Sequence, residues 1–301
     1  MADEPPAQQG WRFTPHGSLG SGALVVLADG SLQAFAARGV PLPPGNRASR
    51  ALEVIEESHD GRLKVTRDDP KTLALIADAV RDAWEFYLIA RALPLQRDAD
   101  LDGKLKVMLR ESKRSSKPRD FQFEQVVGVL FAMAGVLARP AEPDLRFLLN
   151  DQEWGVAVKR VRSVRKLAER TTKAREQLEG QGLRGFIAVN VDAFLADVPA
   201  NRDPTEVGQA FDKAVARLHN LLPELGRQRA LLGIMIIGVV AGWEFDRDKP
   251  HVFHPLIFQG RYLGDDAQDH AVADELFNRL EHGVTQQVAQ VYSEIARAMA
   301  R

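Results

Sequence analysis

The chain has 301 residues, of which 45% are hydrophobic and 27% charged, so it has enough apolar material for a large globular core. It contains no cysteine, which excludes a disulfide framework and any cysteine-ligated zinc site. Its formal net charge of −1 excludes a uniformly basic nucleic-acid binder. The most apolar run, residues 230–243, is too short to span a bilayer, and the acidic, Pro-rich start is unlike a signal peptide. We therefore expect a cytoplasmic protein without membrane contacts.

The N-terminal part of the chain carries mixed signals. Residues 1–17 have a composition typical of disorder. Residues 18–114 are predicted to form an N-terminal α/β region. Within it, Asp29-Gly30 lies between two apolar runs and predicts a β-hairpin over residues 18–40. A short helix followed by a strand is predicted over residues 46–66.

A clear helix follows over residues 68–93, because its apolar residues recur at helical spacing. Asp69 is its predicted N-cap, with Pro70 in the first turn. The basic, Ser-rich stretch at 111–120 is predicted to be a loop. We place a domain boundary near residue 115.

Residues 115–260 alternate regularly between helix and strand signals, and residues 261–301 are predicted to form a C-terminal helical extension. The order predicts an α/β fold in which a mixed β-sheet is flanked by helices. The predicted helices are 120–138 with Asp120 as N-cap, 164–180, 204–225 and 268–300, and the predicted strands are 144–149, 154–160, 185–192, 230–243 and 251–258. Strands 144–149 and 154–160 are predicted to pair antiparallel through the turn between them.

Positive charge is concentrated in two stretches. Residues 106–120 hold six Lys or Arg against two acidic residues, and residues 159–175 hold eight against one. Such segregation would create a local positive field on a nearly neutral protein. A solvated helix face and a basic loop explain the same pattern without any ligand, and the sequence leaves both readings open.

A lysine lies near the end of the strand at 154–160, although the rest of this strand has the apolar pattern of a buried strand. Side chains alternate along a strand, so Lys159 shares a face with Gly155 and Ala157. Lysine is almost never fully buried without a partner. Antiparallel pairing brings the end of this strand back to Asp144, at the start of the preceding one. The sequence predicts that Asp144 and Lys159 meet, either as a structural ion pair or beside a bound phosphate.

These residues resemble the PD-(D/E)XK nuclease superfamily, whose fold is restriction-endonuclease-like. The resemblance rests on Pro143-Asp144, the hairpin and the strand that ends in Lys159. An upstream helix carries Glu124 and the following helix carries Gln177, which are similar to an accessory acid and a glutamine of that family. The resemblance covers about residues 119–195, in the order helix, strand, strand, helix, strand. The resemblance implies a restriction-endonuclease-like core with N-terminal and C-terminal extensions.

The resemblance further implies Mg²⁺-dependent hydrolysis of phosphodiester bonds in DNA. Asp144 and Glu124 would be the metal ligands, Lys159 would stabilise the developing negative charge, and Gln177 would complete the catalytic set. The nucleic-acid backbone would be held by basic residues of the two stretches, with little regard to base sequence. These residues are Arg160, Arg162, Arg165, Lys166, Lys113, Arg114 and Lys117.

The sequence departs from the family where the second acid is expected, because Ala157 stands two residues before the lysine. Helical periodicity places Glu169 and Glu176 on the solvent side of the following helix, and Glu153 is roughly 20 Å from Lys159 along the strand. None of them replaces the missing acid. An inactive relative that binds nucleic acid or a protein partner is therefore an alternative to a nuclease. The oligomeric state stays open.

Overall fold

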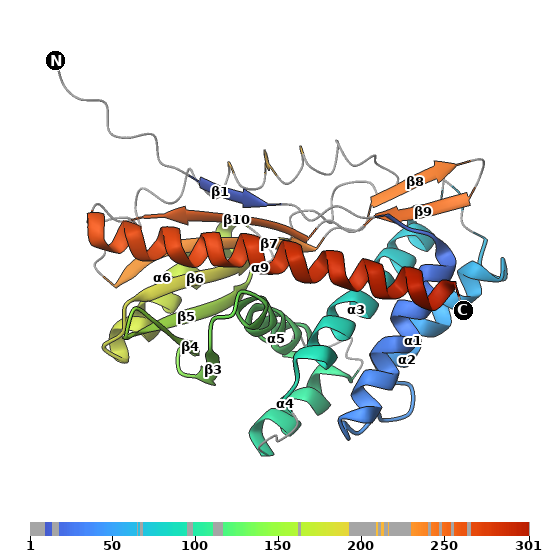
Figure 1. Cartoon of the computed structure of the whole chain (residues 1–301), viewed down its shortest axis with the longest axis horizontal. Helices are drawn as coiled ribbons and strands as arrows, with labels where there is room; N and C mark the ends of the chain where they lie inside the picture. Colours follow the sequence, from blue (N-terminus) through green and yellow to red (C-terminus); the bar gives the residue numbers. More distant parts are fainter. Residues whose placement is uncertain are drawn as a thin grey trace.

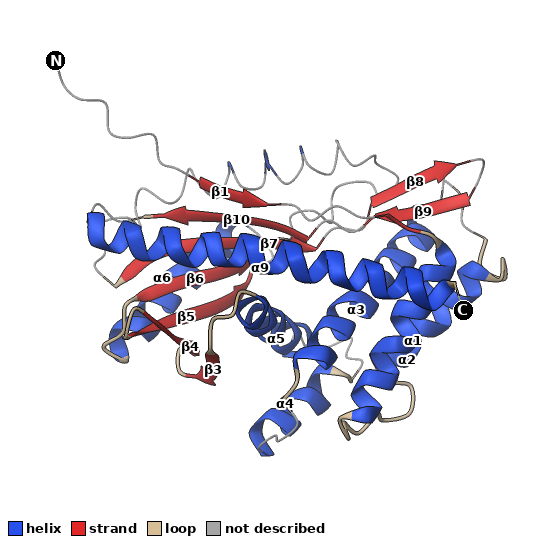
Figure 2. Ribbon diagram, viewed as in Figure 1, coloured by secondary structure: helices blue, strands red, loops and turns tan. Residues whose placement is uncertain are grey.

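A computed structural model describes residues 10–13, 18–64, 66, 69–94, 99–110, 117–161, 164–192, 209, 212–213, 216, 230–239, 242–246, 249–253, 256–263 and 266–300. The described elements form a mixed sheet with helices on both faces and a helical region beyond one end of it (Figures 1 and 2). None of the described helices is long and apolar enough to cross a membrane.

The predicted mixed sheet is confirmed. Seven strands lie in the order β1-β10-β7-β6-β5-β4-β3, in which β5, β6 and β7 are mutually parallel and the remaining pairings are antiparallel. Their bounds are Gly10–Phe13 (β1), Ala138–Ala141 (β3), Asp144–Leu149 (β4), Gln152–Arg160 (β5), Gly185–Asn190 (β6), Leu231–Val239 (β7) and Leu256–Tyr262 (β10). A second sheet has the order β2-β9-β8, with bounds Ser18–Leu19, Lys249–Phe253 and Gly242–Asp246.

The helices divide between the two faces of the larger sheet and the N-terminal region. Their bounds are Ser21–Ala37 (α1), Arg47–His59 (α2), Pro70–Ala92 (α3), Ala99–Met108 (α4), Lys117–Met133 (α5), Val164–Gly180 (α6) and Ala267–Met299 (α9). α5 and α9 share one core cluster with Trp154 and Val156 of β5. α6 packs on the opposite face, where Leu167, Ala174 and Leu178 lie in a second cluster with Ala157. α9 also extends across the sheet to the N-terminal helices (Figure 1), so its apolar face joins two parts of the protein.

Several sequence expectations are confirmed. Asp69 caps α3 by accepting hydrogen bonds from the backbone N–H groups of Lys71 and Thr72 at 3.1 and 3.2 Å. α6 matches the predicted helix, and Leu167, Thr171, Ala174 and Leu178, which share one side of it, are fully buried. The antiparallel pairing of β4 with β5 and the long terminal helix are also as predicted.

The predicted hairpin over residues 18–40 is wrong, because most of this segment is α1. Leu24, Leu27 and Phe35 are buried at helical spacing, and burial of that stripe outweighs the local turn signal of Asp29-Gly30. Gly30 instead serves close packing, since a Cβ there would lie 3.1 Å from the ring of Tyr87. The described part of residues 18–114 is mainly helical, with β2 as its strand.

Other corrections concern the edges of elements. Residues 10–13 form β1 and are not disordered, while residues 1–9 and 14–17 lie outside the described part. The segment that follows α2, residues 60–64, is turn and bend where a strand was predicted. α4 and β3 were not predicted at all. Asp120 lies in the first turn of α5 and is not its N-cap, because the helix already begins at Lys117.

The C-terminal strand predictions each covered two elements. The apolar run 230–243 contains β7 and the start of β8, which lie in different sheets. The predicted strand 251–258 likewise spans the end of β9 and the start of β10. The predicted helix 204–225 lies outside the described residues, except for positions 209, 212, 213 and 216, which are helical.

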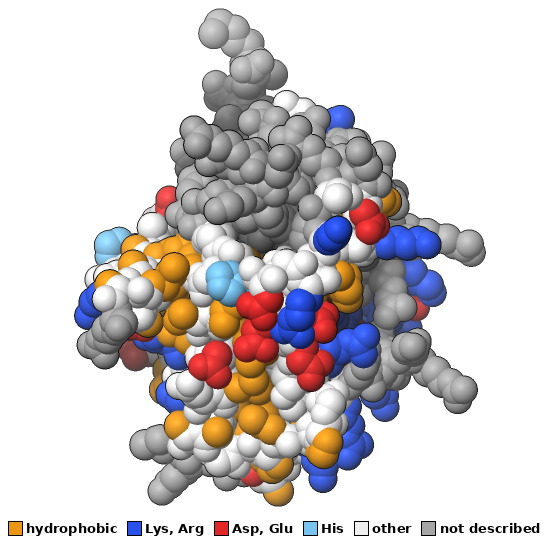
Figure 3. Space-filling model, turned by 90° about the vertical axis from the view of Figure 1, so that its right-hand side faces the viewer, with side chains coloured by type: hydrophobic (Ala, Val, Ile, Leu, Met, Phe, Trp, Pro, Cys, Tyr) orange, Lys and Arg blue, Asp and Glu red, His pale blue; other side chains and the backbone are white. Residues whose placement is uncertain are grey.

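The end of the protein formed by α1, α2 and the C-terminus of α9 carries charges of both signs. Figure 3 shows acidic and basic side chains next to each other there, with hydrophobic side chains around them. Arg62, just after α2, illustrates the pairing, because it lies 3.1 Å from Asp60 and 3.9 Å from Glu57.

Candidate functional site

The β4–β5 hairpin places Asp144 and Lys159 at one corner of the sheet. Its turn residues Asn150 and Asp151 both have positive φ, of 54° and 58°, as a two-residue type I′ turn requires. This turn sets the register in which Leu145 pairs with Val156. Continuing that register puts Asp144 beside the last residues of β5.

The predicted meeting of Asp144 and Lys159 is confirmed. Lys159 Nζ lies 2.8 Å from Asp144 Oδ2, and the same oxygen accepts a hydrogen bond of 2.7 Å from the backbone N–H of Val158. The two side chains keep 11% and 23% of their surface exposed, for Lys159 and Asp144 respectively, so water still reaches the pair. Burial raises the pKa of Asp144, although Lys159 opposes that shift.

The α6 helix supports the same corner. Gln177 Nε2 donates a long hydrogen bond of 3.4 Å to the backbone oxygen of Pro143, next to Asp144. The helix approaches closely because β5 has a glycine there. A Cβ on Gly155 would lie 2.5 Å from Leu178 and 3.2 Å from Pro143. Gly155 therefore allows α6 and the start of β4 to pack together.

A second carboxylate–ammonium pair lies beside the first. Lys104 Nζ on α4 is 2.7 Å from Glu124 Oε1 on α5. Burial raises the pKa of Glu124; Lys104 opposes this, whereas the nearby charge of Asp144 adds to it. Burial alone would lower the pKa of Lys104, but the hydrogen bond to Glu124 and the surrounding carboxylates raise it. We call the set Lys104, Glu124, Asp144, Lys159 and Gln177 the hairpin corner.

Sequence reasoning missed Lys104, because α4 itself was not predicted. The signal in the sequence is weak: Leu101, Leu105 and Met108 recur at helical spacing in a short segment rich in charged residues. Nothing in that pattern points to Glu124, which lies twenty residues further along the chain.

The position of the missing acid is closed to solvent. Ala157 has no exposed surface and packs in the cluster formed with α6. Glu169 and Glu176 are exposed on α6, as predicted. Glu153 pairs with Arg139 and Arg146 at 2.7 and 3.2 Å. These three acids are therefore not substitutes for the absent carboxylate.

The hairpin corner fits a divalent metal ion only in part. Glu124 and Asp144 supply hard carboxylate oxygens close enough for their charges to interact. Mg²⁺ often binds through one or two carboxylates and completes its shell with water and substrate phosphates. In the described part of the chain, however, no three His, Asp or Glu side chains gather as a metal site. The corner therefore offers two carboxylates, each of which is already paired with a lysine.

The residues predicted to hold nucleic acid differ in exposure and in their partners. Lys166 is exposed but lies 2.6 Å from Glu169, and Lys117 is exposed at the start of α5. Arg160 is largely buried, with its Nη1 atom 3.5 Å from Asp120 Oδ1. Lys113, Arg114 and Arg162, together with the side chain of Arg165, lie outside the described residues.

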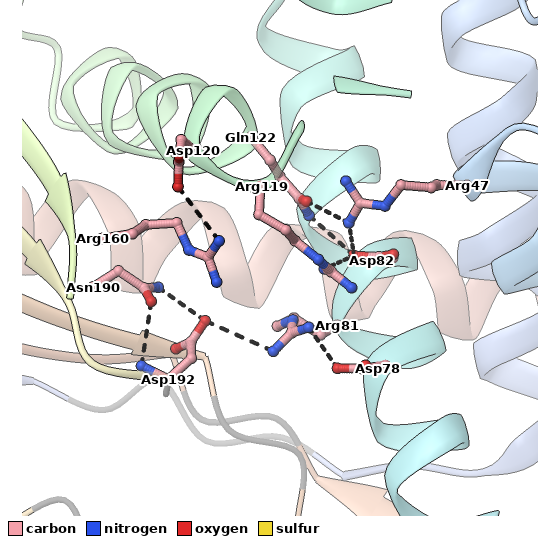
Figure 4. A network of polar contacts seen from close by, with 10 residues as sticks. All are labelled: Arg47, Asp78, Arg81, Asp82, Arg119, Asp120, Gln122, Arg160, Asn190 and Asp192. Atoms are coloured by element: carbon pink, nitrogen blue, oxygen red, sulfur yellow. Dashed lines mark hydrogen bonds and ion pairs between the residues drawn. The ribbon is translucent and has the colours of Figure 1, made fainter. Parts of the chain in front are cut away.

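Arg160 belongs to a second charged cluster, which the sequence did not reveal. Figure 4 shows this cluster between α3, the start of α5 and the ends of β5 and β6. We call it the arginine network; it comprises Arg47, Asp78, Arg81, Asp82, Arg119, Asp120, Gln122, Arg160, Asn190 and Asp192.

Asp82 is the centre of the arginine network. Its carboxylate accepts hydrogen bonds from Arg47 at 2.7 Å, from Gln122 at 3.2 Å and from Arg119. Burial works against its ionised form, but the neighbouring arginines outweigh burial and lower the pKa of Asp82. Glu85, one turn further along α3, is also buried. Burial raises the pKa of Glu85 to about 7.

Arg81 links this centre to the sheet. It lies 2.5 Å from Asp78 and 3.9 Å from Asp192, just beyond β6. Asn190 donates a 2.8 Å hydrogen bond to Asp192 and is itself buried at the end of β6. The network therefore ties α3 to the carboxyl ends of the parallel strands.

No known protein family, curated protein or solved structure shows a significant match to this chain.

Proposed function

We propose that the chain is a metal-dependent nuclease of the PD-(D/E)XK type that hydrolyses phosphodiester bonds in DNA at the hairpin corner. The observation that carries the proposal is the contact between Asp144 and Lys159 in a partly exposed position. A structural ion pair needs no further residues, but here Glu124 and Gln177 lie near the same corner. A plain ion pair does not account for that convergence.

The arrangement of elements around the corner supports the proposal. α5, β3, β4, β5, α6 and β6 follow one another along the chain, with two antiparallel pairings and then the parallel pairing of β5 with β6. This matches the order that the resemblance implies, with β3 as an additional strand. Glu124, Asp144, Lys159 and Gln177 come from four elements of this unit, α5, β4, β5 and α6, with β3 between the first two.

The chemistry follows from the side chains of the corner. Asp144 and Glu124 would hold one Mg²⁺, which supplies a Lewis acid beside the scissile phosphate. Lys159 is positioned to stabilise negative charge that develops on a phosphate oxygen. The ammonium group of Lys104 adds a second positive charge beside the same site. Because Ala157 contributes no oxygen, we expect slow cleavage.

Plasmid cleavage in the presence of Mg²⁺ or Mn²⁺ tests the proposal. We expect nicking by the wild-type protein and its loss in Asp144→Asn, which keeps the size of the side chain but removes its charge. Glu169→Gln is a matched control, since Glu169 is exposed on α6. Equal activity in the wild type and in Asp144→Asn, or no nicking with either metal, would contradict a nuclease.

The second candidate is a catalytically inactive relative that binds nucleic acid or a partner protein. The burial of Ala157 favours it, together with the fact that each carboxylate of the corner already has a lysine partner. DNA retention at increasing salt tests this candidate. Binding through phosphates should weaken steeply as salt rises, even where no cleavage occurs. Absence of retention at low salt would leave a protein partner as the remaining form of this candidate.

A further inference from the structure

A cavity of about 230 Å³ lies between α2, α3 and the start of α5, away from the hairpin corner. Three arginines from two of these helices line it, namely Arg47, Arg50 and Arg119. Asp78 and Asp82 also line it, so cationic side chains outnumber anionic ones. Some of its lining residues belong to the arginine network, and none belongs to the hairpin corner.

The guanidinium groups are held in place while retaining donor capacity. Arg47 donates to the backbone oxygen of Met108 at 3.0 Å, to Asp82 at 2.7 Å and to Gln122 at 2.6 Å. Arg119 donates to the same Asp82. These contacts use only some of the N–H donors that a guanidinium carries. Because Asp82 accepts hydrogen bonds from both groups, the two guanidinium groups are held in position before any ligand arrives.

One shared carboxylate leaves these two arginines with an excess of positive charge. Arg50 adds a third cation at an exposed position of the lining. Asp78 brings a negative charge but lies 2.5 Å from Arg81, which offsets it. The first turn of α5 also contributes to the wall through Pro118 and Arg119, and the start of a helix favours anions. The local field therefore suits an anion.

Apolar side chains line the same cavity. Ala51 and Val54 of α2 and Leu75 and Ala79 of α3 contribute them. Leu75 is 41% exposed, which is unusual for a large hydrophobic side chain here. An anion with an attached apolar group would match both the arginines and the apolar side chains of the lining.

We propose that this cavity binds a phosphate monoester, carried by a mononucleotide or by the terminal phosphate of a nucleic acid. Planar guanidinium groups bind phosphate oxygens through paired hydrogen bonds. The volume is below the roughly 300–1,000 Å³ typical of pockets for drug-sized ligands. It therefore accommodates one phosphate with part of its nucleoside, and excludes a dinucleotide held in full. The site does not depend on the nuclease proposal.

Calorimetric titration with AMP, adenosine and inorganic phosphate tests the assignment on the full chain. We expect AMP to bind, adenosine to bind at least about 10-fold more weakly, and Arg50→Ala to weaken AMP by about 5- to 10-fold, as loss of a charge-assisted hydrogen bond predicts. Arg62→Ala is the matched control, because Arg62 is an exposed arginine that follows the same helix. Arg50 is exposed, so its replacement should leave the fold intact.

Oligonucleotides with a 5′-phosphate or a 5′-hydroxyl identify the source of the phosphate. Tighter binding of the phosphorylated strand, reduced by Arg50→Ala, assigns the cavity to nucleic-acid ends, whereas preference for AMP assigns it to mononucleotides. The proposal is overturned if neither AMP nor inorganic phosphate binds and both oligonucleotides bind equally. It is also overturned if Arg50→Ala and Arg62→Ala reduce affinity to the same extent.

Discussion

The last two residues of β5 belong to two different charged clusters, the hairpin corner and the arginine network. The side chains of Lys159 and Arg160 leave opposite faces of β5, and Lys159 contacts Asp144 of the hairpin corner, whereas Arg160 contacts Asp120 of the arginine network. In the corner, each carboxylate has its own lysine; Asp144 remains partly exposed, whereas Glu124 is buried. In the network, the buried Asp82 is shared by two arginines and an amide.

The difference suggests different roles for the two clusters. An arginine fork is suited to buried ion pairs, whereas a lysine ammonium is a compact charge on a flexible stem, whose place beside a carboxylate a metal ion can take. We therefore expect substitution of Asp82, the buried centre of the network, to act mainly on stability. Substitutions in the corner should act mainly on binding and catalysis.

The largest effect on stability is expected from Asp82→Ala. This change leaves Arg47 and Arg119 as buried cations without their shared partner, which should cost about 3–5 kcal/mol of unfolding free energy. Urea denaturation followed by circular dichroism measures it. Asp78→Ala is the control on the same helix, since the Asp78 side chain is 61% exposed, and it should cost less than about 1 kcal/mol. Similar losses for both variants would contradict the central role of Asp82.

The pH dependence of stability should report on Glu85. Burial raises its pKa in the folded protein from 4.5 to about 7, so the folded state binds this proton more tightly than the unfolded chain does. The stability associated with Glu85 is therefore fully present below about pH 4.5 and is lost as the pH rises to about 7.

Glu85→Gln stays uncharged and should remove this dependence. We expect it to exceed the wild type in stability at pH 8 by on the order of 3 kcal/mol and to match it near pH 4.5. Urea titrations at the two pH values provide the comparison, with Glu57→Gln on the exposed surface of α2 as control. A Glu85→Gln variant that is less stable at pH 8 would show that the ionised form is favourable in the fold.

Asp144→Ala should have a smaller effect on stability than Asp82→Ala. It removes the acceptor for the Val158 N–H and the partner of Lys159, which should cost about 1–3 kcal/mol. Partial exposure of both side chains limits the loss, because water can reach the ammonium group. A loss equal to that of Asp82→Ala, measured in the same denaturation experiment, would place the corner among the structural clusters.

The smallest effect is expected for Lys104→Met, on metal binding. Lys104 competes with a cation for Glu124, so its removal should raise the Mn²⁺ affinity by about 5-fold, equivalent to roughly 1 kcal/mol. Electron paramagnetic resonance of free Mn²⁺ gives the affinity without requiring catalysis. Lys166→Met, on the exposed face of α6, should leave it unchanged. Weaker binding in Lys104→Met would assign the lysine a supporting role in the site.

The corner was largely predictable from sequence because its residues obey local rules. Antiparallel pairing through a short turn is enough to bring Asp144 and Lys159 together, although the turn has two residues, Asn150 and Asp151, where residues 150–153 were predicted. Helical periodicity gave the orientation of Glu169 and Glu176. The arginine network was not predictable, because Arg47, Asp82 and Arg119 come from three separate helices. Their contacts depend on how α2, α3 and α5 pack, which no local pattern encodes.

The N-terminal helices also show that local sequence patterns do not predict how elements pack. Asp29-Gly30 is a strong local turn signal, yet α1 continues through it because its apolar stripe packs against α3. Lys104 was missed for a related reason, since a short helix acquires its role only through contact with α5.

Mn²⁺ binding to Ala157→Glu most directly tests whether the hairpin corner is a metal site lacking one acid. Ala157→Gln is the matched control, because it has the same size without the charge, and circular dichroism verifies that both variants fold. We predict that Ala157→Glu binds Mn²⁺ at least about 10-fold more tightly than Ala157→Gln, and that Asp144→Asn in the same chain abolishes the gain. Equal affinities of the two folded variants, or a gain that survives Asp144→Asn, would contradict the assignment.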